Sequence, residues 1–205
     1  TSDEWIKPRT GISQRHISHV NTSELASVAA KRALAAAGLE GSDIDLIILA
    51  TASPDTLIPN IASTVQANIG ASCGAFDINA ACSGFLYGLG LASSQIKSGQ
   101  SKKVLVIGAE RLSFYLDWSR RETAVLFGDG AGAVVLGASD EPGILSTHLH
   151  ADGQYRELLS TKGGVSEGFP EGSDGRTHVT MQGNEVCQMT VNTLSRMVDD
   201  TMAAS

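Results

Sequence analysis

The sequence predicts an α/β fold, in which helices and strands alternate along the chain and pack in layers. Near-continuous apolar runs at residues 45–51 and 103–109 are typical of strands that are buried on both faces. Segments with helical periodicity separate such runs, and capping residues and glycines mark the ends of these helical segments. A further run of strands is expected in the second half, so we predict one layered sheet with a meander, in a single domain spanning residues 1–205.

Local signals place the first elements. The polar segment 1–19 predicts an opening turn of helix, followed by extended chain after Pro8. Asn21, with Glu24 three residues later, predicts a capping box for a helix that ends at Gly38. Pro59 is expected at the first position of a second helix that ends near residue 70.

The later elements follow from the same signals. We expect strands at residues 75–79, 103–109, 123–127, 131–138, 143–150 and 178–181, and helices at 83–97 and 183–202. Residues 128–133 are expected to form a tight glycine turn, and residues 155–177 a loop.

Cys82 stands where the strand at 75–79 meets the helix at 83–97. Free N–H groups and the positive end of the dipole at a helix N-terminus stabilise an anion, and the thiolate is the reactive form of cysteine. A strand-to-helix elbow also presents a side chain at the edge of a sheet where substrates dock. Cys82 is therefore a candidate nucleophile, although most free cysteines are buried structural residues.

The surrounding residues resemble a known family. Asn-Ala-Ala-Cys-Ser-Gly-Phe at 79–85 resembles the nucleophile segment of β-ketoacyl-acyl-carrier-protein synthase III, a condensing enzyme of the thiolase superfamily. Further segments resemble that family in its order: Thr-Ser-Asp-Glu-Trp-Ile at 1–6, Arg-Thr-Gly-Ile at 9–12, Phe-Gly-Asp-Gly-Ala-Gly-Ala at 127–133, Ser-Thr-His-Leu-His-Ala-Asp-Gly at 146–153 and Gly-Asn-Glu-Val at 183–186.

This resemblance implies the thiolase-like layered fold, with residues 1–205 covering mainly its N-terminal half and the start of the next segment. It also implies an acyltransferase that loads an acyl group from acyl-CoA onto Cys82. The acyl group would then be condensed with malonyl-acyl-carrier protein to start fatty-acid synthesis. The family's histidine and asparagine partners stand in the contexts Pro-His-Gln-Ala-Asn and Gly-Asn-Thr-Ser, and neither string occurs in residues 1–205. A condensing enzyme of secondary metabolism, and a non-catalytic folded half-domain, are the alternatives.

The resemblance further assigns binding residues. Those matched to coenzyme A binding are Thr1, Trp5, Arg9 and Arg121, with Gly183 and Asn184 lining the pantetheine channel. Those expected to line the acyl pocket are Ile58, Leu126, Phe127 and Met181, with Ile58 doing so in a partner subunit. Arginine can stack on tryptophan and can bind phosphate through its bidentate guanidinium. Residue type alone nevertheless favours Trp5 as a hydrophobic plug and Arg9 as a surface charge, so the assignment comes from the resemblance. The chain departs from the family at Lys7-Pro8, at Glu122, where glycine is usual and phosphate binding is expected to weaken, and at Cys187.

Composition excludes several function classes. The net charge of -7 gives no reason to expect nucleic-acid binding, and no apolar run approaches a membrane span. Three cysteines without a framework spacing favour a reducing compartment, so we expect a cytoplasmic protein. Gly-Asp-Gly-Ala-Gly-Ala at 128–133 satisfies a dinucleotide fingerprint, but a strand is expected after it where a helix is required. His148 and His150 alternate without a third metal ligand, so we expect no metal. The resemblance implies no cofactor, with a coenzyme A thioester as substrate. A homodimer is expected from the resemblance.

Overall fold

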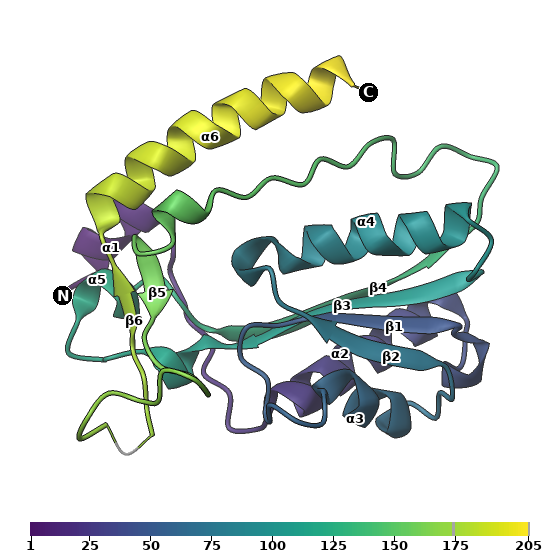
Figure 1. Cartoon of the computed structure of the whole chain (residues 1–205), viewed down its shortest axis with the longest axis horizontal. Coiled ribbons are helices and arrows are strands. Elements are labelled where there is room, and N and C mark those ends of the chain that lie inside the picture. Colours follow the sequence, from purple (N-terminus) through teal and green to yellow (C-terminus); the bar gives the residue numbers. More distant parts are fainter. Residues whose placement is uncertain (174, 205) are drawn as a thin grey trace. The chain divides into compact units, whose positions relative to one another are not determined.

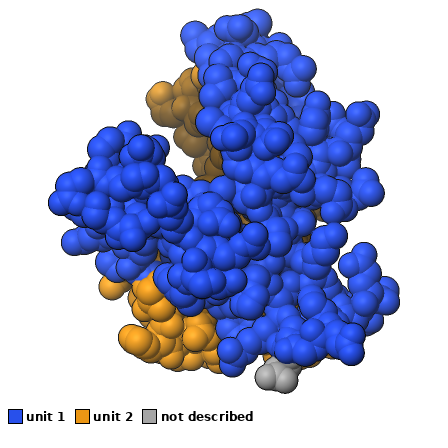
Figure 2. All heavy atoms as spheres, turned by 90° about the vertical axis from the view of Figure 1, so that its left-hand side faces the viewer, with its two compact units in different colours: residues 1–16, 112–128, 148–205 blue, residues 17–111, 129–147 orange. Residues whose placement is uncertain are grey.

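The computed structural model describes residues 1–173 and 175–204, which form two compact units, each built from separate stretches of the chain. One unit comprises residues 17–111 and 129–147, and the other comprises residues 1–16, 112–128 and 148–205; Figure 2 colours them separately. The α/β fold predicted from the sequence is confirmed. The prediction of one domain over residues 1–205 stays a prediction.

The unit with residues 17–111 and 129–147 is built on a four-stranded sheet with the order β2-β1-β3-β4 (Figure 1). Strand β1 pairs in parallel with β2 and β3, and β4 runs antiparallel to β3. The elements of this unit are α2 (Thr22–Ala37), the 3₁₀ turn η1 (Gly41–Asp43), β1 (Leu46–Ala50), α3 (Ile61–Asn68), β2 (Gly74–Ile78), the 3₁₀ turn η2 (Ala81–Ser83), α4 (Gly84–Lys97), β3 (Lys103–Arg111) and β4 (Asp129–Gly137).

Helices cover both faces of this sheet. Helices α2 and α3 pack on one face and α4 packs on the other (Figure 1). Alternate residues of β1 therefore enter different cores, with Ile47 and Leu49 facing α2 and α3 while Ile48 faces α4. All three side chains are fully buried, which confirms the prediction of a strand that is buried on both faces.

The unit with residues 1–16, 112–128 and 148–205 contains a smaller sheet than the other unit. Strands β5 and β6 pair antiparallel as a two-stranded sheet, and β6 leads into α6. The elements are α1 (Asp3–Thr10), the 3₁₀ turns η3 (Leu112–Tyr115) and η4 (Gly153–Tyr155), α5 (Arg121–Ala124), β5 (Leu159–Thr161), β6 (Val179–Met181) and α6 (Gly183–Ala203). No helix in the described part of the chain combines the length and the apolar character needed to cross a membrane.

Helix boundaries confirm the capping prediction and correct two predictions about proline. Asn21 and Glu24 form the reciprocal capping box of α2, and Gly38 ends the helix with φ of 66°. The helix α1 continues past Pro8 to Thr10, because Arg9 and Thr10 donate side-chain bonds to the carbonyls of Trp5 and Ile6. Pro59 lies outside α3, because the Asn60 side chain accepts from the Ser63 N–H and is the cap.

Four predictions for the second half of the chain were wrong. The predicted turn at 128–133 is mostly strand, since β4 begins at Asp129 and pairs with β3 along its whole length. A strand is predicted at 123–127, but residues 121–124 form helix α5, because the Arg120 carbonyl accepts from the N–H groups of Thr123 and Ala124. Residues 143–150 form no strand, since none of the described strands hydrogen-bonds with them, and the predicted loop at 155–177 contains β5.

A buried glycine offers a test of this packing. We expect Gly41→Ala to lower the free energy of unfolding by about 3 kcal/mol or more, because a Cβ atom there would lie 2.0 Å from the backbone oxygen of Ile69. Gly143→Ala is the matched control, since its Cβ would meet nothing within 4 Å. Urea unfolding followed by circular dichroism measures both, and equal midpoints would contradict the close contact.

Candidate active site around Cys82

Cys82 lies in the 3₁₀ turn η2, which joins β2 to the first residue of α4. The side chain of Cys82 is exposed. Ala81, directly before it, has φ of 46°, a left-handed conformation that non-glycine residues rarely adopt. The Asn79 side chain accepts from the Ala81 N–H at 3.1 Å and supports this turn. The predicted strand-to-helix elbow is therefore present, and it places the sulfur at the N-terminal end of α4.

A cavity of about 270 Å³ opens beside Cys82. Apart from Cys82 and one acidic residue, Glu110, its lining consists of alanines, glycines and Phe85. The lining residues are Ala50, Ala81, Cys82, Phe85, Gly108, Ala109, Glu110, Gly130, Ala131 and Gly132. A Cβ built on Gly130 or Gly132 would meet nothing within 4 Å, so these glycines leave the space beside the sulfur open.

Glu110 is the residue of this cavity that the sequence reasoning missed. Its carboxylate accepts hydrogen bonds from the Ala52 N–H at 2.8 Å, from Thr51 Oγ1 at 3.4 Å and from Ser53 Oγ. Burial raises the pKa of Glu110 above its usual value, although these hydrogen bonds act in the opposite direction. A signal was present, because a charged residue directly follows the buried run at 103–109 and so lies at the end of a strand.

The other two cysteines lie in different surroundings. Cys73 is half-buried, and burial raises the pKa of its thiol. Cys187 is exposed on α6. Of the three, only Cys82 combines exposure with the end of a helix and a cavity.

The residues predicted to hold coenzyme A lie in the other compact unit, where several come together. The guanidinium carbons of Arg9 and Arg121 lie 4.5 Å and 4.7 Å from the centre of the Trp5 ring. Thr1 and Arg121 line a cavity of about 520 Å³ in the same unit. Two cations beside one indole form a cation–π cluster that suits a flat anionic ligand.

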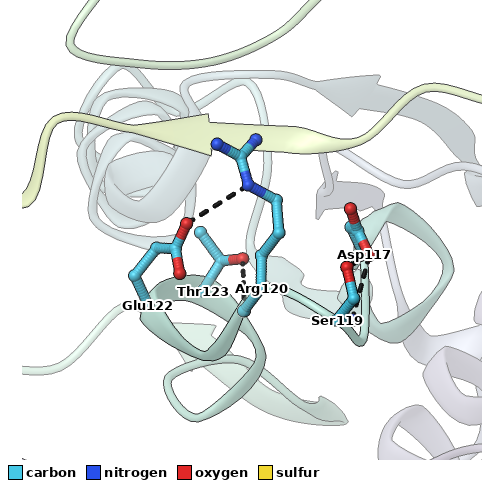
Figure 3. Close-up of polar contacts among 5 residues, drawn as sticks. All are labelled: Asp117, Ser119, Arg120, Glu122 and Thr123. Carbon is cyan, nitrogen blue, oxygen red and sulfur yellow. Dashed lines mark hydrogen bonds and ion pairs between the residues drawn. The ribbon is translucent and has the colours of Figure 1, made fainter.

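Glu122, the departure from the family at this place, pairs with a neighbouring arginine. Arg120 Nε donates to Glu122 Oε1 at 3.2 Å, and Figure 3 shows the two side chains pointing toward one another. Arg121 instead contacts Trp5. The geometry thus separates the two arginines, one partnering the acidic residue and the other the indole.

Comparison with known proteins agrees with this geometry. The family model for 3-oxoacyl-[acyl-carrier-protein] synthase III matches residues 76–153, which include the elbow. The chain is 52% identical over its whole length to a β-ketoacyl-[acyl-carrier-protein] synthase III of Xanthomonas campestris pv. campestris strain 8004, and 55% identical to one of Xylella fastidiosa strain Temecula1. The crystal structure of the synthase III from Pseudomonas aeruginosa PAO1 covers 100% of this chain with a TM-score of 0.89 at 38% identity.

The chain belongs to the β-ketoacyl-[acyl-carrier-protein] synthase III family. It spans 64% of the length of the two curated relatives and 62% of the Pseudomonas chain. The thiolase-like fold predicted from the resemblance is confirmed by these neighbours.

The remaining synthase III assignments stay predictions. Leu126 and Phe127 are partly buried beyond α5, and Met181 is partly buried at the end of β6. Ile58 belongs to the other unit and is 90% exposed. Gly183 and Asn184 open α6 and are exposed. Among the described residues, no three histidine, cysteine or acidic side chains are grouped as a metal site.

The raised pKa of Glu110 predicts a pH dependence of stability. In the folded chain Glu110 keeps its proton to a higher pH than in the unfolded chain, where its pKa is 4.5. Raising the pH through the folded-state pKa therefore lowers the free energy of unfolding. The free energy of unfolding of the wild type, minus that of Glu110→Gln, should therefore be larger at about pH 4 than at about pH 7. Glu141→Gln, an exposed glutamate of the same unit, controls for lost charge. A pH-independent difference would contradict the raised pKa.

Proposed function

We propose that the intact protein is an acyltransferase that starts fatty-acid synthesis by condensing an acyl-CoA with malonyl-acyl-carrier protein. The observation that carries this proposal is Cys82, exposed at the N-terminal end of α4 beside an apolar cavity. The curated relatives at 52% and 55% identity bear the name of this synthase, which supports the choice of substrates.

In the loading step, the Cys82 thiolate attacks the thioester carbonyl, and the bond from that carbon to the sulfur of coenzyme A breaks. Coenzyme A leaves as a thiolate that takes a proton from solvent, and the acyl group stays on Cys82. In condensation, malonyl-acyl-carrier protein loses CO₂, and the resulting carbanion attacks the acyl carbon and releases the Cys82 thiolate. The family's histidine and asparagine would stabilise the enolate in that second step.

Coenzyme A is proposed to bind at the cluster of Trp5, Arg9 and Arg121, here called the Trp5 cluster. Arg121 would hold the adenine against the indole, and Arg9 would anchor phosphate through its fork. Thr1, Gly183 and Asn184 would complete the path of the ligand, with Ile58, Leu126, Phe127 and Met181 around the acyl chain. A cytoplasmic location is part of this proposal, since three cysteines without a framework spacing suit a reducing compartment.

A homodimer is also proposed, paired through β2. Strand β2 is one of the two edges of the four-stranded sheet, and Phe76 within it is 37% exposed. An uncovered edge invites further pairing, and a two-fold axis covers both copies with one patch. Sedimentation of the intact protein at micromolar concentration should give a dimer, and a monomer would refute this pairing.

A panel of acyl-CoA starters tests the function. Intact mass should rise by one acyl group, and peptide mapping should place it on Cys82, which iodoacetamide should also alkylate before Cys73 and Cys187. Cys82→Ser is the control and should stay unmodified. No acyl transfer from any starter, or equal labelling of all three cysteines, would reject the proposal.

Combining the same starters with malonyl groups on different carrier proteins separates a second candidate. The priming β-ketosynthase of the R1128 polyketide pathway is 34% identical and covers 94% of this chain with a TM-score of 0.88. Condensation with malonyl groups carried only by a carrier protein of secondary metabolism would favour that alternative.

The Trp5 cluster gives a kinetic prediction. We expect Trp5→Ala and Arg121→Ala to raise KM for acyl-CoA about tenfold or more while kcat changes little, because these contacts supply uniform binding. Arg120→Ala is the matched control, since the Arg120 side chain pairs with Glu122. Steady-state kinetics of the intact protein measure both constants. A large loss of kcat at constant KM would contradict the proposal that Trp5 and Arg121 bind coenzyme A.

A further inference from the structure

We propose that Glu110 is a positioning residue for Cys82, because its carboxylate holds the loop 51–53 on which the strand-to-helix elbow rests. The inference rests on the proposed function only in that Cys82 is taken as the nucleophile.

The first step is the engagement of the carboxylate. One oxygen of Glu110 accepts from the Ala52 N–H at 2.8 Å, and the other accepts from Thr51 Oγ1 at 3.4 Å and from Ser53 Oγ. Thr51 and Ser53 are only 4% and 6% exposed. A half-buried carboxylate that accepts from three successive residues fixes their backbone and lowers the cost of its own burial.

The loop is tied to β3 a second time. The Arg111 N–H donates to Ser53 Oγ at 2.8 Å, so the hydroxyl that donates to Glu110 also accepts from the next residue of β3. The Ser53 carbonyl accepts from Thr22 Oγ1 at 2.7 Å. The Glu110 carboxylate is therefore one of several contacts that fix the loop 51–53, and it is the one that bonds to all three of its residues.

The elbow rests on this loop and on the end of β1. The Thr51 N–H donates to the carbonyl of Ile78, the last residue of β2, at 3.1 Å. On the other side of Cys82, a Cβ built on Gly84 would lie 3.0 Å from the Cβ of Ala50. The turn that contains Cys82 is thus held at its start by Thr51 and packed at its end against the residue before Thr51.

Cys82 and Glu110 also line the same cavity, so a shift of the loop alters the wall beside the sulfur. Ala81 keeps its φ of 46° only while its surroundings hold it. Loss of the carboxylate would release one of those constraints and misplace the nucleophile relative to a bound thioester. Small misplacements of this kind cost large factors in rate.

The test compares Glu110→Ala and Glu110→Gln with the exposed control Glu141→Gln, in the intact protein. Glutamine keeps the shape and one acceptor oxygen, whereas alanine keeps neither. We expect Glu110→Ala to slow acylation of Cys82 at saturating acyl-CoA by about tenfold or more with KM little changed. Glu110→Gln should be intermediate and Glu141→Gln unchanged. Equal losses in the glutamine and alanine variants, or an alanine rate within about twofold of wild type, would overturn the proposal.

Alkylation by iodoacetamide separates this inference from the function it rests on. If no acyl-CoA acylates wild-type Cys82, the proposed function fails, and Glu110 is judged by the ratio of Cys82 to Cys187 labelling. That ratio should change at least about threefold in Glu110→Ala and less in Glu110→Gln, and an unchanged ratio overturns the inference. Faster labelling of half-buried Cys73 with an unchanged ratio would assign Glu110 a purely structural role.

If Glu110→Ala does not fold, Ser53→Ala is tested in its place, because this variant removes one of the donors to the Glu110 carboxylate. A smaller loss of Cys82 acylation in that variant supports the proposal, and a rate equal to wild type overturns it.

Discussion

The parallel pairing of β1 with both β2 and β3 is the constraint on which the chemistry of this chain depends. The register places Ala50 opposite Ile78 on one side and opposite Gly108 on the other. The C-terminal ends of the three strands therefore meet at one edge of the sheet, and residues at or just after each end contribute to the same site. The loop 51–53, the Cys82 elbow and Glu110 are these three contributions. Open α/β sheets bind their ligands at this edge for the same reason.

Glycine in α4 shows how far that constraint reaches into local sequence. Glycine destabilises a helix by about 1 kcal/mol relative to alanine, yet α4 contains Gly84, Gly88 and Gly90. A Cβ on Gly88 would lie 3.0 Å from Val106 Cγ1, as close as the Gly84 position lies to Ala50. Close approach of the helix to the sheet thus outweighs helix propensity, and a conflict between local and tertiary preference coincides with the functional site.

The elements that the sequence predicted correctly carry their signals locally. Buried strands β1 and β3, the Asn21 capping box and the elbow at Cys82 each follow from neighbouring residues. The errors at 128–133 and 143–150 concern strand pairing, which depends on distant partners that periodicity does not identify. Glu110 was missed for the same reason, since its partners at residues 51–53 are 57 to 59 positions away in the chain. The residues of the Trp5 cluster came from resemblance, because a tryptophan and an arginine alone predict no ligand.

The contacts around Trp5 change what an affinity for coenzyme A would measure. Arg121 lies 4.7 Å from the indole centre, whereas a base between the two would need two van der Waals separations of about 3.5 Å each. In the proposed binding mode, adenine would enter between the two only after this arginine moves back from the indole, and the contact between Arg121 and Trp5 would be lost. The free energy of binding would then be reduced by the loss of that contact, so the wild-type affinity would understate how strongly Trp5 and Arg121 hold the base.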